Sequence, residues 1–218
     1  MANKTFVLFD LDGTLTDSGS GIVASYRHAL ASLGLSATDD QLRRCVGPPI
    51  SANMVELGVP FDLVDQAIAS YREYFTAQGM FDNALYPQTR EMLEQLSRAG
   101  IRLGVATSKL EEYARQIIEH FGIAQFFEEV SGATRDNTRV SKLDIAVHAL
   151  VNMGSPPPAQ GALVGDREHD MFAACELDLA AVGAMWGYGD KAELLAAGAQ
   201  LLVDSPQAAA EALLAGRP

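Results

Sequence analysis

Short runs of apolar residues, each followed by a longer segment with helical spacing, constrain the fold of this 218-residue chain most strongly. The runs are apolar at every position, as expected of strands that are buried on both faces of a parallel sheet. Strands are predicted at residues 6–9, 103–106, 162–164, 180–182 and 201–203, and helices at 88–99, 110–120, 141–151, 170–176, 191–197 and 206–214. This alternation predicts an α/β fold with a doubly wound, Rossmann-like parallel sheet.

The first predicted strand is followed by a long block in which no convincing strand is visible. Apolar residues recur there at helical spacing, in residues 22–33 and 61–75. We therefore expect an α/β core domain formed by residues 1–17 and 87–218, and an inserted all-helical cap domain formed by residues 18–86. Open α/β sheets bind ligands at the carboxyl ends of their strands, so an insert at this point would lie over such a site.

The charge balance excludes several classes of partner. The chain has 16 Lys and Arg residues against 28 Asp and Glu residues, a net charge of −12, and no basic run. Binding to a nucleic acid polymer or to an anionic membrane surface is therefore not expected, and an anionic substrate would need a locally positive site. Cys45 and Cys175 are too few for a disulfide framework and lack metal-ligand spacing. With no signal-peptide pattern and no apolar stretch of about 18 residues, a cytoplasmic location is expected.

Carboxylates follow two of the predicted strands. Asp10 and Asp12 come directly after the first strand, where Gly13 allows the chain to turn sharply, and Asp166 and Asp170 repeat the pattern after a later strand. Like charges so close together need a cation or a proton, and a set of oxygen ligands suits Mg²⁺. The alternatives are an ordinary turn at the end of the first strand and, for Asp170, an acid favoured by the dipole at a helix N-terminus.

Two further elements have the chemistry of a phosphate site. Thr107 and Ser108 lie where a predicted strand ends and a helix begins, so a hydroxyl and backbone N–H groups there can hold phosphate oxygens. The same hydroxyl is equally suited to capping the helix. Lys142 opens a predicted helix and would supply the cation that phosphate binding among carboxylates requires, although a lysine in this place is typically a solvated surface residue.

Together these motifs resemble those of the haloacid dehalogenase superfamily, in the branch of phosphatases with a helical cap inserted after the first strand. The resemblance rests on the D-x-D-G-T segment at residues 10–14, then Thr107, Lys142 and G-D-x-x-x-D at residues 165–170, in that order. It covers essentially the whole chain. One departure is Leu143, where family members often have proline.

Within the superfamily the chain most resembles bacterial phosphoglycolate phosphatases and the related proteins labelled 5′-nucleotidases, and two loops carry the similarity to the 5′-nucleotidases. They are V-G-P-P at residues 46–49 and W-G-Y-G at residues 186–189. The resemblance implies that the cap selects the substrate. The candidate specificity residues of the cap are Ser18, Gly47, Pro48 and Pro49.

The resemblance implies a Mg²⁺-dependent phosphomonoester hydrolase. Asp10 would attack phosphorus and form an aspartyl-phosphate, and Asp12 would act as general acid and base. The implied metal ligands are Asp10, Asp12 through its backbone carbonyl, and Asp166, with Asp170 in support; the implied phosphate-binding residues are Thr107, Ser108 and Lys142.

The substrate and the reaction class stay open at this point. Arginines of the cap would suit a carboxylate, as in 2-phosphoglycolate, and its aromatic residues would suit the base of a nucleoside 5′-monophosphate. The alternatives to a phosphatase are a phosphomutase-like enzyme and a non-enzymatic, Mg²⁺-dependent module that binds phosphorylated ligands. We expect a monomer or a homodimer that acts on a small phosphorylated metabolite.

Overall fold

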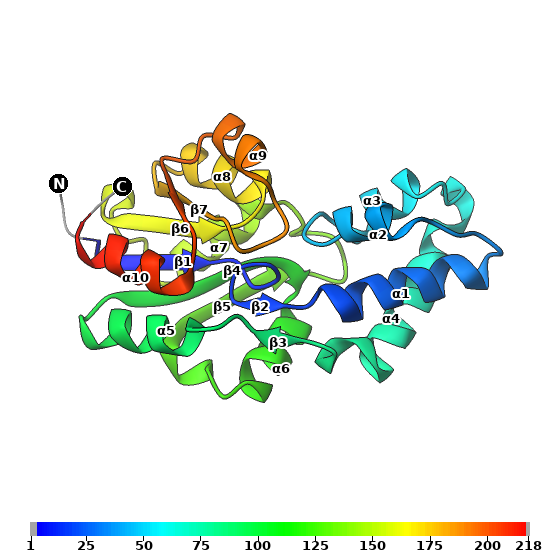
Figure 1. The fold of residues 1–218 in the computed structure, drawn as a ribbon, viewed down its shortest axis with the longest axis horizontal. Helices are drawn as coiled ribbons and strands as arrows, with labels where there is room; N and C mark the ends of the chain where they lie inside the picture. The colour runs from blue at the N-terminus through cyan, green and yellow to red at the C-terminus, as the bar shows by residue number, and fades with distance from the viewer. Residues whose placement is uncertain (1–3, 217–218) are drawn as a thin grey trace. The chain divides into compact units, whose positions relative to one another are not determined.

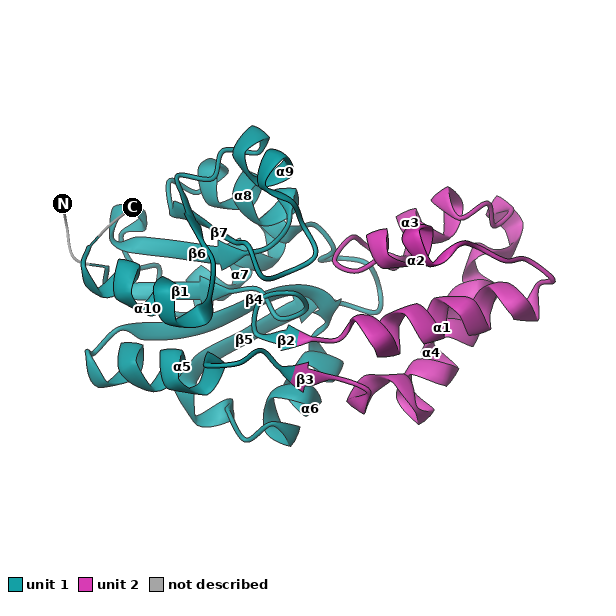
Figure 2. Cartoon of the chain, in the orientation of Figure 1, with its two compact units in different colours: residues 1–16, 85–218 teal, residues 17–84 magenta. Residues whose placement is uncertain are grey.

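The chain divides into two compact units in a computed structural model that describes residues 4–216. One unit comprises residues 1–16 and 85–218, and the other residues 17–84 (Figure 2). The predicted core ends its first segment one residue later, at 17, and begins its second segment two residues later, at 87. Residues 1–3 and 217–218 of the predicted core lie outside the described residues. The chain crosses between the units in β2 (Thr16–Asp17) and β3 (Ala84–Leu85), which pair with each other.

The larger unit is built on a six-stranded sheet in the order β5-β4-β1-β6-β7-β8, and its neighbouring strands are all parallel. The strands are β1 (Phe6–Phe9), β4 (Arg102–Leu110), β5 (Phe127–Ala133), β6 (Gly161–Gly165), β7 (Ala180–Ala184) and β8 (Leu201–Val203). The chain adds β4 and β5 on one side of β1 and β6, β7 and β8 on the other. The strand order therefore reverses beside β1, where ligands bind in open α/β sheets.

Helices cover both faces of this sheet (Figure 1). On one face lie α5 (Thr89–Arg98), α6 (Glu111–His120) and α10 (Pro206–Leu214), and on the other α7 (Lys142–Asn152), α8 (Glu168–Glu176) and α9 (Lys191–Ala196). Short 3₁₀ turns, η3 (Ala124–Phe126) and η4 (Pro158–Gln160), precede β5 and β6. All four residues of β1 are buried, and Phe6 and Leu8 belong to the apolar cluster that also contains residues of α7 and α8. Burial on both faces explains why β1 is continuously apolar, and it confirms the predicted α/β fold.

The sequence pattern did not predict β5. Its first three residues, Phe127, Glu128 and Glu129, are partly or fully exposed, whereas residues 130–133 are buried. The strand lies at the edge of the sheet and pairs only with β4. An edge strand that is half solvated lacks the continuous apolar run by which its neighbours were recognised.

The smaller unit is helical apart from the terminal residues of the crossing strands. It contains α1 (Gly19–Ser32), α2 (Asp39–Arg44), α3 (Ile50–Glu56) and α4 (Val64–Ala77), with 3₁₀ turns η1 (Phe61–Leu63) and η2 (Gly79–Phe81). Buried aromatic rings join α1 to α4: the ring centroids of Tyr26 and Tyr71 lie 4.7 Å apart, and those of Tyr71 and Phe75 lie 5.8 Å apart. These aromatic residues belong to the core of the unit, together with buried aliphatic side chains such as Leu30 and Met54.

No disulfide joins Cys45, which is buried, to Cys175, which is exposed. Within residues 4–216, none of the helices combines the length and the apolar character that crossing a bilayer requires.

Candidate active site

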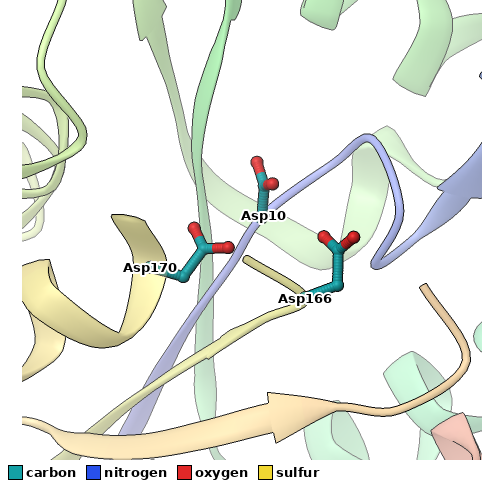
Figure 3. A group of neighbouring side chains, drawn as sticks. All are labelled: Asp10, Asp166 and Asp170. Atoms are coloured by element: carbon teal, nitrogen blue, oxygen red, sulfur yellow. The ribbon is translucent and has the colours of Figure 1, made fainter. Parts of the chain in front are cut away.

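Three aspartates meet at the carboxyl ends of β1 and β6. Asp10 follows β1, Asp166 follows β6, and Asp170 lies in the first turn of α8; all three are buried. One carboxylate oxygen from each lies within 4.8 Å of the others, and Figure 3 shows the carboxyl groups turned toward the same space. The parallel pairing of β1 with β6 continues beyond the strands, because the Asp10 N–H donates to the Val164 carbonyl at 2.9 Å. Adjacent parallel strands thus bring residues that lie far apart in the chain to one sheet edge.

The D-x-D-G-T segment folds into a tight turn against Asp166. The N–H groups of Leu15 and Thr16 both donate to the Leu11 carbonyl at 2.9 Å. Gly13 has φ +87°, and a Cβ there would lie 2.2 Å from Asp166 Oδ2. Only glycine meets both conditions, the left-handed backbone and the close approach of a carboxylate.

Lys142 is the cation of this cluster. Its Nζ lies 2.7 Å from Asp10 Oδ1 and 2.9 Å from Asp170 Oδ1, and it donates to the Ala106 carbonyl at 3.0 Å. The side chain is 5% exposed, so the alternative of a solvated surface lysine is wrong. Burial opposes the charged ammonium, but the two carboxylates outweigh it and raise the pKa of Lys142. Leu143 in place of proline does not prevent this geometry.

The carboxylates carry more negative charge than Lys142 can balance. Burial raises the pKa of Asp10 to about 6, Lys142 opposes this rise, and the charge of Asp170 adds to it. Burial raises the pKa of Asp166 well above its usual range, and the charges of Asp10 and Asp170 add to the rise. Asp10 Oδ1 and Asp170 Oδ1 are both buried, and both face the one ammonium group of Lys142. An all-oxygen, electron-rich cluster of this kind fits a hard divalent cation.

Asp170 also stabilises the start of α8. Its Oδ2 accepts a hydrogen bond from the Arg167 N–H at 3.1 Å, while its Oδ1 faces Lys142. Asp170 therefore serves both as an acid at a helix N-terminus and as a member of the cluster.

Asp12 has a partner that the sequence analysis did not assign. Its Oδ2 lies 2.8 Å from Lys109 Nζ, and the two side chains are 9% and 6% exposed. By residue type and hydropathy, Lys109 is indistinguishable from a surface lysine near a helix start. The only available signal was its position, two residues beyond Thr107 at a strand end.

Thr107 lies beside the lysine of the cluster, because Lys142 donates to the carbonyl of the preceding residue, Ala106. Thr107 is buried, and its Oγ1 accepts a hydrogen bond from the Lys109 N–H at 3.3 Å. The helix-capping alternative for Thr107 is wrong, since α6 begins at Glu111. Ser108 is half-buried, and the phosphate-binding roles of both residues stay predictions.

The predicted specificity residues all belong to the smaller unit. Ser18 is buried immediately before α1, Gly47 has φ +108°, and Pro49 precedes α3. The carbonyl of Pro48 accepts a hydrogen bond from Asn53 Nδ2 at 3.2 Å, which ties this loop to α3. Their contribution to substrate choice stays a prediction.

Comparison with known proteins finds relatives that are named as a kinase, a nucleotidase and a phosphatase. A family model described as "Haloacid dehalogenase-like hydrolase" matches residues 7–184. The "Tyrosine-protein kinase PtkA" of Mycobacterium tuberculosis (strain ATCC 25618 / H37Rv) is 44% identical over 184 residues, 84% of this chain but 62% of PtkA. This chain thus spans less than two thirds of that relative's length. A "5'-nucleotidase" of Pseudomonas aeruginosa is 36% identical over 192 residues, which cover 87% of this chain and 86% of the relative. A "Phosphoglycolate phosphatase" of Vibrio parahaemolyticus is 28% identical over 209 residues, 91% of each chain.

Solved structures share the whole fold. The crystal structure of a predicted phosphatase from Clostridium acetobutylicum matches with a TM-score of 0.93 and 34% identity, covering 98% of this chain and 100% of that chain. The structure of M. tuberculosis PtkA matches with a TM-score of 0.84 and 39% identity, covering 97% of this chain and 98% of that chain.

Proposed function

The chain belongs to the haloacid dehalogenase-like hydrolase family, and on that premise we propose that it is a Mg²⁺-dependent phosphomonoester hydrolase that acts through an aspartyl-phosphate on Asp10. One observation carries the proposal: three buried carboxylates and Lys142 meet where the strand order of the sheet reverses. The substrate class is a small phosphorylated metabolite. The names of two relatives support 2-phosphoglycolate and nucleoside 5′-monophosphates as candidates.

In the first half of the reaction, an oxygen of Asp10 attacks the phosphorus of the ester. The bond between phosphorus and the leaving oxygen breaks, and protonated Asp12 gives its proton to that oxygen, which departs as an alcohol. Lys109, 2.8 Å from Asp12 Oδ2, restrains the side chain that delivers the proton.

In the second half, water attacks the phosphorus of the aspartyl-phosphate. Asp12, now a carboxylate, takes a proton from that water, the bond from Asp10 to phosphorus breaks, and inorganic phosphate leaves. Both carboxylates then return to their starting states. Dividing one displacement into two in this way replaces one difficult step by two easier ones.

The residues that would hold Mg²⁺ are Asp10, the backbone carbonyl of Asp12, and Asp166, with Asp170 in support. When bound, the ion supplies positive charge that stabilises the phosphoryl oxygens. Lys142 and the Thr107–Ser108 segment supply the remaining positive charge and hydrogen bonds to the same oxygens.

The test is phosphate release from 2-phosphoglycolate, from nucleoside 5′-monophosphates and from an aryl phosphate, each with Mg²⁺ and with a chelator. The proposal expects Mg²⁺-dependent release that is lost in Asp10→Asn. Release that survives both chelation and this substitution would overturn it. Transfer of phosphate between two positions of one sugar would identify a phosphomutase, and Mg²⁺-dependent binding without turnover would identify a non-enzymatic module.

A second candidate function is phosphoryl transfer to a tyrosine hydroxyl, favoured by the similarity to the tyrosine-protein kinase PtkA. The same nucleophile would serve, and the acceptor would be a phenolic oxygen instead of water. Incubation with γ-labelled ATP and a tyrosine-containing polypeptide separates the candidates. Label on tyrosine would indicate the kinase activity, and label in inorganic phosphate alone would indicate hydrolysis.

A further inference from the structure

We propose that the segment Trp186–Gly189, which follows β7, is a positioning element for Asp166. It would orient both carboxylate oxygens of this metal-ligand candidate and link them to the turn that carries Asp10 and Asp12. The inference rests on the proposed function in its choice of ligand, a divalent cation.

Hydrogen bonds connect this segment to both oxygens of Asp166. The backbone N–H of Tyr188 donates to Asp166 Oδ2 at 2.8 Å. The hydroxyl of Thr14 donates to Asp166 Oδ1 at 3.2 Å, and the indole Nε1–H of Trp186 donates to the Thr14 carbonyl at 3.0 Å. Asp166 and Thr14 are both completely buried. Each carboxylate oxygen therefore has a fixed donor and retains a lone pair for a further ligand.

The glycines of the segment let its backbone lie directly against Asp166. A Cβ at Gly187 would lie 2.3 Å from Asp166 Cβ and 2.4 Å from the Gly13 carbonyl oxygen. A Cβ at Gly189 would lie 2.0 Å from the Asp166 carbonyl oxygen. Backbone atoms cannot yield to such contacts, so glycine at both positions is a steric requirement of this packing.

The segment also connects three neighbouring strands. Thr14 lies beyond β1, Asp166 lies beyond β6 and Trp186 lies beyond β7, and these strands are adjacent in the sheet. A donor to a carboxylate favours its ionised form and restricts its rotation, both of which a metal ligand requires. In other metal sites such outer partners contribute about 10–100-fold to metal affinity.

The experiment measures divalent-ion binding to the full chain without substrate. Trp186 is the only tryptophan of the chain, so its fluorescence should change saturably as Mg²⁺ is added. Trp186→Phe keeps an aromatic ring and removes the N–H donor, and Thr14→Val removes the hydroxyl. Followed by Mn²⁺ paramagnetic resonance and by calorimetry with Mg²⁺, both variants should bind about tenfold more weakly than the wild type.

Thr14→Ser, which restores the hydroxyl, should recover most of the affinity, and Gly187→Ala should lose the most. Met185→Leu is the matched control: it changes the neighbouring side chain, has a similar volume, and should keep wild-type affinity. The inference is overturned if Trp186→Phe and Thr14→Val bind as the wild type does, or if Thr14→Ser binds as weakly as Thr14→Val. The binding experiment contains no substrate, so its result does not depend on turnover. A chain that binds Mg²⁺ as expected but releases no phosphate in the separate assay would contradict the proposed function and not this inference.

Discussion

The two units of the chain bury different kinds of polar side chain. In the larger unit the buried charged side chains include four carboxylates and two cations: Asp10, Asp12, Asp166, Asp170, Lys109 and Lys142. In the smaller unit the buried polar side chains are neutral within the described residues: Ser18, Ser25 and Asn53. Buried charge is costly unless it is paired, so a cluster with more carboxylates than cations indicates a binding or catalytic role.

An ion pair of the smaller unit shows the opposite environment. Arg27 pairs with Asp39 at 2.7 Å, but the two side chains are 56% and 70% exposed, and such pairs contribute only about 0–1 kcal/mol. On this difference we propose separate tasks: the larger unit would determine whether phosphate is transferred, and the smaller unit would determine which ester is accepted. The predictions below test this division.

The largest effect is expected from Asp10→Asn. Removal of the nucleophile should lower kcat for every phosphate ester, on the order of 10⁴-fold or more. The same change should raise the melting temperature of the chelated protein above pH 6, because burial raises the pKa of Asp10 to about 6 and its charged form is disfavoured there. Phosphate release and thermal melts with EDTA measure the two effects.

Asp136→Asn is the control for this prediction. Asp136 is exposed and accepts hydrogen bonds from the N–H and hydroxyl of Thr138, and donors from Thr134 and Thr138 lower its pKa to about 2. Its replacement should not raise the melting temperature of the chelated protein, and it should leave kcat unchanged. An Asp10→Asn protein that hydrolyses aryl phosphates normally, or melts lower than the wild type in EDTA, would contradict the account of the cluster.

Asp12→Asn should separate leaving groups. An alkyl ester such as 2-phosphoglycolate needs a proton on its departing oxygen, so kcat should fall about 10²–10⁴-fold, the usual contribution of general acid–base catalysis. An aryl phosphate leaves without that help, so Asp12→Asn should slow its first half, seen as a burst of phenol release, far less, while the second half, in which Asp12 is the base, should slow equally for both esters. Mg²⁺ affinity should be retained, because the proposed metal contact of Asp12 is its backbone carbonyl. Equal slowing of the first half for both esters, or a loss of metal binding, would refute the assigned role.

The third prediction concerns the pH dependence of stability. The pKa of Asp10 is about 6 in the folded protein against 3.8 for an ordinary aspartate, so between these values the folded state binds more protons than the unfolded state. Stability of the chelated protein should therefore fall as pH rises from about 4 to 6, by at most about 3 kcal/mol from this group. Mg²⁺ replaces those protons, so its stabilising effect should be larger at pH 7.5 than at pH 5.

Thermal melts across this pH range, with Mg²⁺ and with EDTA, measure the effect. A stabilisation by Mg²⁺ that is the same at pH 5 and pH 7.5 would show that protons and the metal do not compete at the cluster. Lys142 titrates outside this window, because its carboxylate partners raise its pKa above the usual lysine range. Its own ionisation therefore does not contribute to the slope.

The positions of the carboxylates were predictable because strand ends are visible in the sequence. A continuously apolar run marks a strand with two buried faces, and Asp10 and Asp166 each follow such a run. Parallel strands place their carboxyl ends at one edge, which is why residues so distant in the chain could be predicted to converge. The edge strand β5 lacked this pattern and was missed, since its first residues are exposed.

The environments of the lysines and of the W-G-Y-G segment were not predictable in the same way. Lys142 and Lys109 have the same chemistry as surface lysines, and only the fold shows that one contacts Asp10 and the other contacts Asp12. The role of Trp186 depends on a hydrogen bond to a carbonyl 172 residues away in sequence. Hydropathy and spacing describe which face a residue occupies, and they do not specify such pairings.

The smallest effect on chemistry is expected from Asn53→Ala in the smaller unit. Asn53 Nδ2 donates to the Tyr26 hydroxyl at 2.7 Å, to the Cys45 carbonyl at 2.8 Å and to the Pro48 carbonyl at 3.2 Å. Its loss would leave buried acceptors unsatisfied and release the loop around Gly47, which should lower stability by about 1–3 kcal/mol. For a small aryl phosphate kcat should stay at the wild-type value, while KM for the preferred ester should rise.

Tyr26→Phe is the matched control for Asn53→Ala. It removes one acceptor, keeps the ring that packs on Tyr71, and should cost about 1 kcal/mol with no change in KM, because the bonds from Asn53 to the loop remain. Chemical denaturation and steady-state kinetics on both esters measure these effects. If Asn53→Ala lowered kcat for the aryl phosphate as much as Asp12→Asn does, the smaller unit would take part in the chemical step, and the division of tasks between the units would be wrong.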